Sequence, residues 1–148
     1  MQKRPASAPD QETARILSVS PLFDDHRTLE KLSRCRQWRI IRALTLGQAS
    51  YFIKHQSFSM VVCERDLAPG SWKNVLADIG SLASPPFLIV TSSQADEYLW
   101  SEALNLGAYD VLAKPFVNEE VIRTFTMASL HSQYQIDLSR VRVRSAAG

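Results

Sequence analysis

Five short apolar segments, spaced along the chain, constrain its fold more than any other feature. They are rich in Val, Ile and Leu, and most lack the strict apolar–polar alternation of a half-exposed strand. This composition is typical of strands that are covered on both faces of a parallel sheet. The segments are RILSVS (15–20), WRIIRAL (38–44), SMVVCE (59–64), PFLIVTS (86–92) and YDVLAK (109–114).

Segments with helical patterns separate these predicted strands. Apolar residues between 72 and 79 repeat at the spacing of one helix face. The segment 95–107 has acids in its first turn and Gly107 placed to end a helix, and Asn118 is placed to cap the last helix. Less regular patterns cover 25–37 and 46–56. Strands that alternate with helices predict an α/β domain with an open, mainly parallel sheet.

Length, charge and composition agree with one globular domain. A chain of 148 residues suits one domain with short tails: a disordered tail over 1–13, the domain over 14–130, and a helix extension with a basic tail over 131–148. The net charge of +2 is too small to favour nucleic acid as a partner. No apolar run is long enough to span a membrane, and the N-terminus does not resemble a signal peptide. A cytoplasmic location is therefore predicted.

Polar residues gather where the predicted strands end. Ligands of open α/β sheets bind outside the carboxyl ends of the strands, so these residues form the candidate site. Acids, a hydroxyl and a lysine from separate strands could bind a phosphoryl group or a Mg²⁺–phosphate pair. Each also has a structural explanation: a solvated loop lysine, a strand threonine, or a surface acid paired with Arg65. The residues are Ser20, Pro21, Glu64, Asp66, Thr91, Ser92, Lys114 and Pro115.

Three of these segments, in this order, resemble a known family. SMVVCERDLAPG (59–70), PFLIVTS (86–92) and GAYDVLAKPF (107–116) are similar to the third, fourth and fifth strands of bacterial response regulator receiver domains, the CheY-like superfamily. The resemblance implies a flavodoxin-like (βα)5 doubly wound sandwich with a five-stranded parallel sheet. It also implies a role in two-component phosphorelay signalling, in which a histidine kinase provides a phosphoryl group to an aspartate.

The family pattern assigns a role to each strand-end residue. Thr91 and Lys114 match the switch hydroxyl and the lysine that contact the phosphoryl group, and Pro115 is a cis-proline candidate. Glu64 falls at the position of the phosphoacceptor aspartate. Asp66, two residues further on, is the alternative acceptor. The resemblance therefore places a carboxylate at the acceptor position, but on a longer side chain.

The acid pair that holds Mg²⁺ in the family corresponds here to Ser20 and Pro21. Asp24 and Asp25 follow and are alternative metal ligands. We favour a capping role for both at the start of the first helix, where aspartate is common. The resemblance then implies weak Mg²⁺ binding at best, and no other cofactor is predicted.

These departures favour an atypical receiver over a phosphorylated one. The extra methylene of Glu64 displaces the nucleophile, and misplacement on this scale costs on the order of 100-fold in rate. Glu64 could instead be a permanent partner of Lys114. We therefore predict a single-domain, non-enzymatic receiver that signals by protein–protein interaction, with weak or no phosphorylation. The alternative is a phospho-active receiver that uses Glu64 or Asp66, with Mg²⁺ held by Asp24 or Asp25.

The partner face of the family corresponds to residues 95–130, with Tyr98 and Trp100 as exposed candidates. The predicted partner is a signalling protein such as a histidine kinase or a downstream effector, and the same face is a candidate homodimer surface. A remote alternative is a flavodoxin-like cofactor-binding enzyme. The loop SPLFDDH has no glycine-rich cradle for phosphate, which disfavours that alternative.

Overall fold

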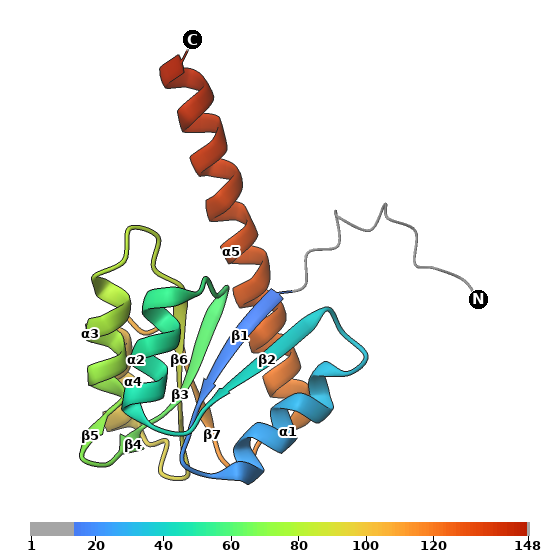
Figure 1. The fold of residues 1–148 in the computed structure, drawn as a ribbon. Coiled ribbons are helices and arrows are strands. Elements are labelled where there is room, and N and C mark those ends of the chain that lie inside the picture. The colour runs from blue at the N-terminus through green and yellow to red at the C-terminus, as the bar shows by residue number, and fades with distance from the viewer. Residues whose placement is uncertain (1–13, 148) are drawn as a thin grey trace.

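The computed structural model describes residues 14–147, with side chains placed as far as Arg142. The predicted tail over 1–13 lies outside the described residues. Five parallel strands form one sheet in the order β2-β1-β3-β6-β7, and helices cover both of its faces (Figure 1). The strands are β1 (Ala14–Val19), β2 (Trp38–Ala43), β3 (Met60–Glu64), β6 (Phe87–Ser92) and β7 (Asp110–Ala113). The predicted doubly wound α/β fold is confirmed, and every strand boundary falls within one residue of its prediction.

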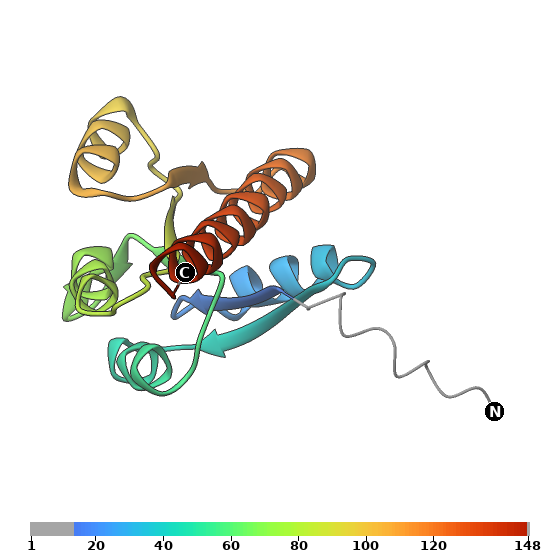
Figure 2. The ribbon, with the colours of Figure 1, turned by 90° about the horizontal axis from the view of Figure 1, so that it is seen from above.

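The helices divide between the two faces of the sheet, as the view in Figure 2 shows. Helices α1 and α5 pack on one face, and α2, α3 and α4 pack on the other. Their bounds are α1 (Phe23–Ser33), α2 (Leu46–His55), α3 (Trp72–Gly80), α4 (Glu97–Leu106) and α5 (Asn118–Ala147). A short antiparallel hairpin, β4 (Asp66–Leu67) and β5 (Gly70–Ser71), links β3 to α3.

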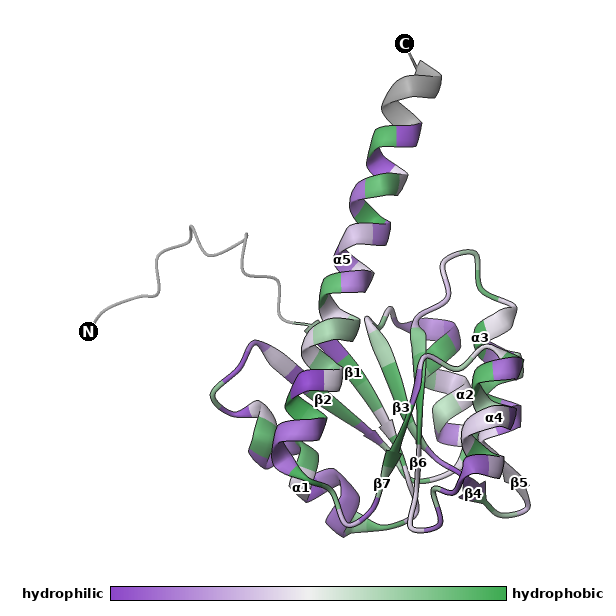
Figure 3. Ribbon diagram, turned by 180° about the vertical axis from the view of Figure 1, so that it is seen from behind, coloured by the Kyte–Doolittle hydropathy of each residue, from purple (hydrophilic) through white to green (hydrophobic). Residues whose placement is uncertain are grey.

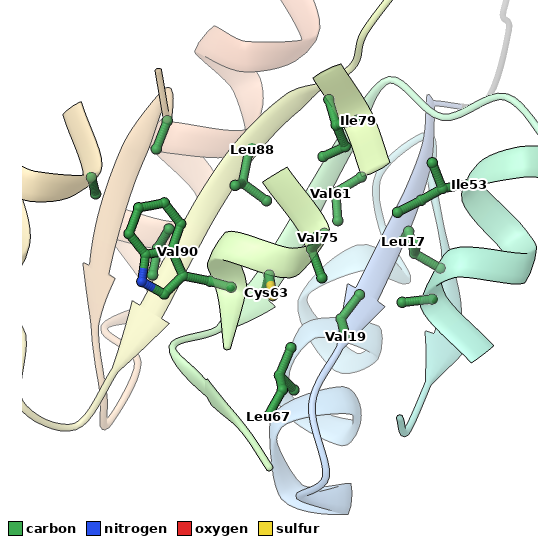
Figure 4. Close-up of a cluster of buried hydrophobic side chains, with 14 of the residues drawn as sticks. Leu17, Val19, Ile53, Val61, Cys63, Leu67, Val75, Ile79, Leu88 and Val90 are labelled. Atoms are coloured by element: carbon green, nitrogen blue, oxygen red, sulfur yellow. The ribbon is translucent and has the colours of Figure 1, made fainter. Parts of the chain in front are cut away.

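The apolar segments read as continuous runs because both faces of the sheet are buried. Along β3, Val61 and Cys63 pack towards α2, α3 and α4, whereas Met60 and Val62 pack towards α1 and α5. Side chains alternate between faces along a strand, so a strand between two helical layers is apolar at successive positions. Figure 4 shows the first of these two cores, where Val61 and Cys63 lie beside Val75 of α3 and Val90 of β6.

Local signals set the ends of the helices. Asp96 caps α4 by accepting a hydrogen bond from the backbone N–H of Leu99 at 2.9 Å. Gly107 ends α4 in the left-handed conformation with φ of 109°. Two predictions were wrong in detail. Asn118 is the first residue of α5 rather than its cap, and α1 ends at Ser33 because residues 34–37 form a turn.

Helix α5 continues through the predicted extension. It is 30 residues long, and its C-terminal half projects beyond the sheet (Figure 1). Within the described residues, no helix has both the length and the apolar character needed to cross a bilayer.

Candidate functional site

Four parallel strands bring the predicted site residues to one edge of the sheet. Glu64 ends β3 and pairs in register with Thr91 of β6. Lys114 follows the last residue of β7, and Ser20 follows the last residue of β1. Because the carboxyl ends of parallel strands meet at the same edge, these residues converge although they are far apart in the sequence.

The side chains at this edge form one connected network. Lys114 Nζ lies 2.9 Å from Glu64 Oε2 and 2.8 Å from Asp25 Oδ2. The Thr91 hydroxyl donates to Glu64 Oε2 at 3.0 Å, and the Ser20 hydroxyl donates to Asp25 Oδ2 at 2.6 Å. Glu64 and Asp25 are each only 9% exposed. We call these five residues the strand-end cluster.

Asp25 belongs to this cluster rather than to a helix cap. Helix α1 begins two residues after Pro21, with Leu22 at the N-cap position and no side-chain capping hydrogen bond. The favoured capping interpretation is therefore wrong for Asp25, whose carboxylate contacts Lys114 and Ser20 instead. It is wrong for Asp24 as well, because this exposed residue lies 3.8 Å from Arg27 and outside the cluster.

Charge and burial act in opposite directions on Lys114. Burial disfavours its ammonium form, but the hydrogen bonds to Asp25 and Glu64 outweigh burial and raise the pKa of Lys114 above its ordinary value. The Lys114 ammonium group thus forms ion pairs with two nearly buried carboxylates. The cluster is an ion network that depends on a single cation.

A buried histidine supports the same edge, and the sequence pattern did not reveal it. His26 is fully buried, with Nδ1 2.8 Å from the Ser18 hydroxyl and Nε2 2.9 Å from the Ser20 carbonyl oxygen. Burial lowers the pKa of His26, with a further contribution from Arg42, although the hydrogen bond to Ser20 opposes the shift. Neutral His26 therefore fixes the turn between β1 and α1. No sequence spacing signals this contact, because β1 and α1 bring its members together only in the fold.

The alternative acceptor, Asp66, lies outside the cluster. Its carboxylate is 2.9 Å from Arg65 Nη2, and its side chain is 71% exposed. The hydrogen bond to Asp66 raises the pKa of the Arg65 guanidinium. The Lys114–Pro115 peptide bond, in contrast, is part of the site and is cis.

The donor set does not fit the Mg²⁺ site of the family. Ser20 and Pro21 are the residues that the family resemblance predicts at the acid pair, and neither has a carboxylate. Asp25 and Glu64 each direct one oxygen to Lys114. Within the described residues, no group of three or more His, Cys, Asp or Glu side chains lies close enough to hold a metal ion. Mg²⁺ prefers carboxylates that remain open to it and to its waters.

The predicted partner face contains exposed aromatic side chains. Tyr98 is 79% exposed and Trp100 is 39% exposed, both on α4. Trp100 and Leu104 line a shallow hollow of about 300 Å³ with Arg123 and Met127 of α5. Apolar groups from two helices therefore meet at this surface.

The comparisons with known proteins agree on one fold. The signal receiver domain of an HD domain-containing protein from Pseudomonas fluorescens has a TM-score of 0.77 and 20% identity, and the match covers 85% of this chain and 93% of that chain. A CheY-like response regulator receiver domain protein from Methanospirillum hungatei has a TM-score of 0.74 and 16% identity, and the match covers 82% of this chain and 98% of that chain. This chain has the receiver fold.

A third similar structure is the receiver domain of the sensor histidine kinase PA1611 from Pseudomonas aeruginosa, with a magnesium ion coordinated in its active-site cleft. It has a TM-score of 0.65 and 20% identity, and the match covers 74% of this chain and 92% of that chain. No family model matches the sequence, and no curated protein matches it. The similarity therefore lies in the fold, at 16–20% sequence identity.

Proposed function

We propose that this protein is an atypical receiver that signals by protein–protein contact in a two-component phosphorelay, with weak or no phosphorylation. The observation that carries the proposal is the position of Glu64. Its carboxylate lies within hydrogen-bond distance of both Lys114 and Thr91. These are the ammonium and hydroxyl groups that a receiver directs to its phosphoryl group.

The strand-end cluster is already charged and connected without a phosphoryl group. A phosphoryl group on Glu64 would have to displace one carboxylate oxygen from Lys114 and Thr91, in a site that is 9% exposed. Without an acid pair at Ser20 and Pro21, Mg²⁺ would also lack its usual anchoring there. The fixed carboxylate–ammonium contact supports a permanently set site over a switched one.

The output would then depend on a surface rather than on a reaction, so we propose a binding module and not an enzyme. The partner is a signalling protein, such as a histidine kinase or a downstream effector, that binds the face formed by α4, β7 and the first part of α5. Tyr98 and Trp100 provide exposed aromatic groups at that face. Aromatic side chains of this kind often dominate the binding energy of protein interfaces.

The first test is intact-mass analysis after incubation with acetyl phosphate and Mg²⁺. The wild type is compared with Glu64→Ala and Asp66→Ala, beside a receiver with an ordinary acid pair as a positive control. We expect no phosphoryl adduct on the wild type. An adduct that is lost in Glu64→Ala or in Asp66→Ala would overturn the proposal and identify the acceptor.

A second test uses the phosphoryl analogue beryllofluoride with Mg²⁺ and follows the amide NMR signals of Thr91 and Lys114. We expect both signals to remain in place in the wild type. Saturable shifts at both residues would mean that the site accepts a phosphoryl-like group, and would favour the phospho-active alternative. The Tyr98 and Trp100 signals report whether the partner face responds.

A further inference from the structure

Helix α5 carries an exposed apolar stripe that extends into the part of the helix that projects beyond the sheet in Figure 1. Figure 3 shows hydrophobic residues recurring between hydrophilic ones along this part of the helix. At 100° per residue, the members lie on one side of the helix within an arc of about 80°. Four of them are between 44% and 60% exposed, and Leu138 is half-buried. The apolar stripe consists of Met127, Leu130, Tyr134, Leu138 and Val141.

The spacing of the apolar stripe is that of a helix that packs along another helix. Successive members are three, four, four and three residues apart, which is an eleven-residue repeat that places Leu138 over Met127 and Val141 over Leu130. Such a repeat keeps its apolar side almost straight along the helix, with a slight right-handed supercoil. A single isolated helix gains nothing from this arrangement.

Within residues 14–142, no other part of the protein covers the apolar stripe, four of whose members are 44–60% exposed. Ile136 lies on the opposite side of α5, where it lines a hollow of about 730 Å³ together with Phe58 and Phe87 of the domain. Met127 lies beside Trp100 at the α4 surface, and from there the stripe continues away from the domain. The side of α5 that faces away from the domain is therefore apolar and exposed.

Charges on the two flanks of the stripe identify the partner. Asp137 lies beside the stripe on the Leu130 side, and Arg142 lies beside it on the Leu138 side. In the part of the chain whose side chains are described, neither residue forms an ion pair. When two such helices pack in parallel about a two-fold axis, opposite flanks face each other, and residues five apart meet across the seam. An antiparallel pair would instead bring like flanks together.

We propose that a second copy of this chain packs in parallel along the apolar stripe of α5. Tyr134, Leu138 and Val141 of the two copies then meet at the seam. Asp137 of each copy faces Arg142 of the other, so the ion pair forms twice. This surface overlaps the predicted face over 95–130 only at Met127 and Leu130, and its seam lies beyond that face, at Tyr134, Leu138 and Val141. The proposal does not depend on how the strand-end cluster works.

The extent of the stripe predicts a modest affinity. From Met127 to Val141 the helix rises about 21 Å, at 1.5 Å per residue. The dissociation constant of the dimer should therefore be in the low micromolar range or weaker. Because each flank charge acts twice across the two-fold axis, reversing one charge should weaken the dimer on the order of 10-fold.

The first measurement is sedimentation equilibrium of the full chain, over protein concentrations from low micromolar to near millimolar. We expect a monomer–dimer equilibrium for the wild type and a monomer for Leu138→Glu. Ile136→Glu is the matched control, since it adds the same charge on the opposite side of α5 and should leave the equilibrium unchanged. Circular dichroism checks that both variants remain folded.

The charge pair provides a test that leaves the apolar stripe intact. Asp137→Arg and Arg142→Asp should each weaken the dimer, and the double variant should restore it. Orientation is tested by disulfide formation at Leu138→Cys in a Cys35→Ser background, because Cys35 is itself exposed. We expect efficient cross-linking at position 138 and little for Ile136→Cys.

Three results would each overturn the proposal. They are a wild type that stays monomeric near millimolar concentration, a dimer that survives Leu138→Glu, and a double charge variant that dimerises no better than the single ones.

Discussion

Replacing Lys114 by methionine should destabilise this protein more than any other single change in the strand-end cluster. Methionine preserves much of the side-chain volume but leaves Asp25 and Glu64 without the cation that both contact, at 2.8 and 2.9 Å. The Lys114 side chain is 10% exposed and the two carboxylate side chains are 12% and 11% exposed, so solvent screens the loss poorly. Breaking a buried ion pair from one side costs about 3–5 kcal/mol in the free energy of unfolding.

A second estimate gives the same magnitude. Two unit charges 4 Å apart attract by about 4 kcal/mol at an effective dielectric constant of 20. For a domain of this size the loss should lower Tm on the order of 10 °C. Glu64→Gln is the graded comparison: it should cost only about 1–2 kcal/mol, because Lys114 keeps Asp25 and the amide oxygen can still accept from Thr91.

The assay is urea unfolding at neutral pH, followed by tryptophan fluorescence. In Lys114→Met the two carboxylates stay buried but lose the cation that both contact, so the deficit relative to the wild type should be the largest among the cluster variants. A loss below about 1 kcal/mol at neutral pH, as for an exposed pair, would refute the buried ion network.

Three further variants test other parts of the structure. Because burial lowers the pKa of His26 below 6.5, the unfolded chain takes up the proton first as the pH falls. The free energy of unfolding should therefore hold above pH 6.5 and decline below it. His26→Gln should reduce this decline, as urea unfolding at several pH values would show. Asp66→Ala removes an exposed partner of Arg65 and should change the free energy of unfolding by less than about 1 kcal/mol. Gly107→Ala places a side chain at φ of 109° and should lower stability by about 1 kcal/mol or more, as thermal unfolding would show.

The sheet was predictable because its strands are buried on both faces. An unbroken apolar run such as SMVVCE has few structural alternatives when turn residues and helical patterns flank it. The edge where the site lies follows from the parallel order, since every such strand ends at the same side of the sheet. Glu64, Thr91 and Lys114 were therefore expected near one another, and the structure places them in contact.

Side-chain direction was less predictable than position. Asp25 stands in the first turn of α1, where the preference of aspartate for helix starts favoured a cap. The Asp25 side chain instead points to Lys114, which follows β7 and lies 89 residues further along the chain. No local sequence pattern predicts a contact at that separation. The apolar stripe of α5, in contrast, had a readable signal. An eleven-residue apolar repeat runs from Met127 to Val141, across the predicted domain boundary at residue 130.

The proposed function depends on one methylene group in the strand-end cluster. An aspartate at the end of β3 would stop short of the groups that contact a phosphoryl oxygen and leave space for that group. Glutamate at the same position places its own oxygen 2.9 Å from Lys114 and 3.0 Å from the Thr91 hydroxyl. An incoming phosphoryl group must then compete with this carboxylate for the contacts of Lys114 and Thr91. The carboxylate is part of the chain and loses no translational entropy when it makes these contacts. The competition also lacks the Mg²⁺ anchoring that acids at Ser20 and Pro21 would provide. In the proposed function, the Glu64 carboxylate takes the place of the phosphoryl group, and we propose that regulation acts through contacts made elsewhere on the protein.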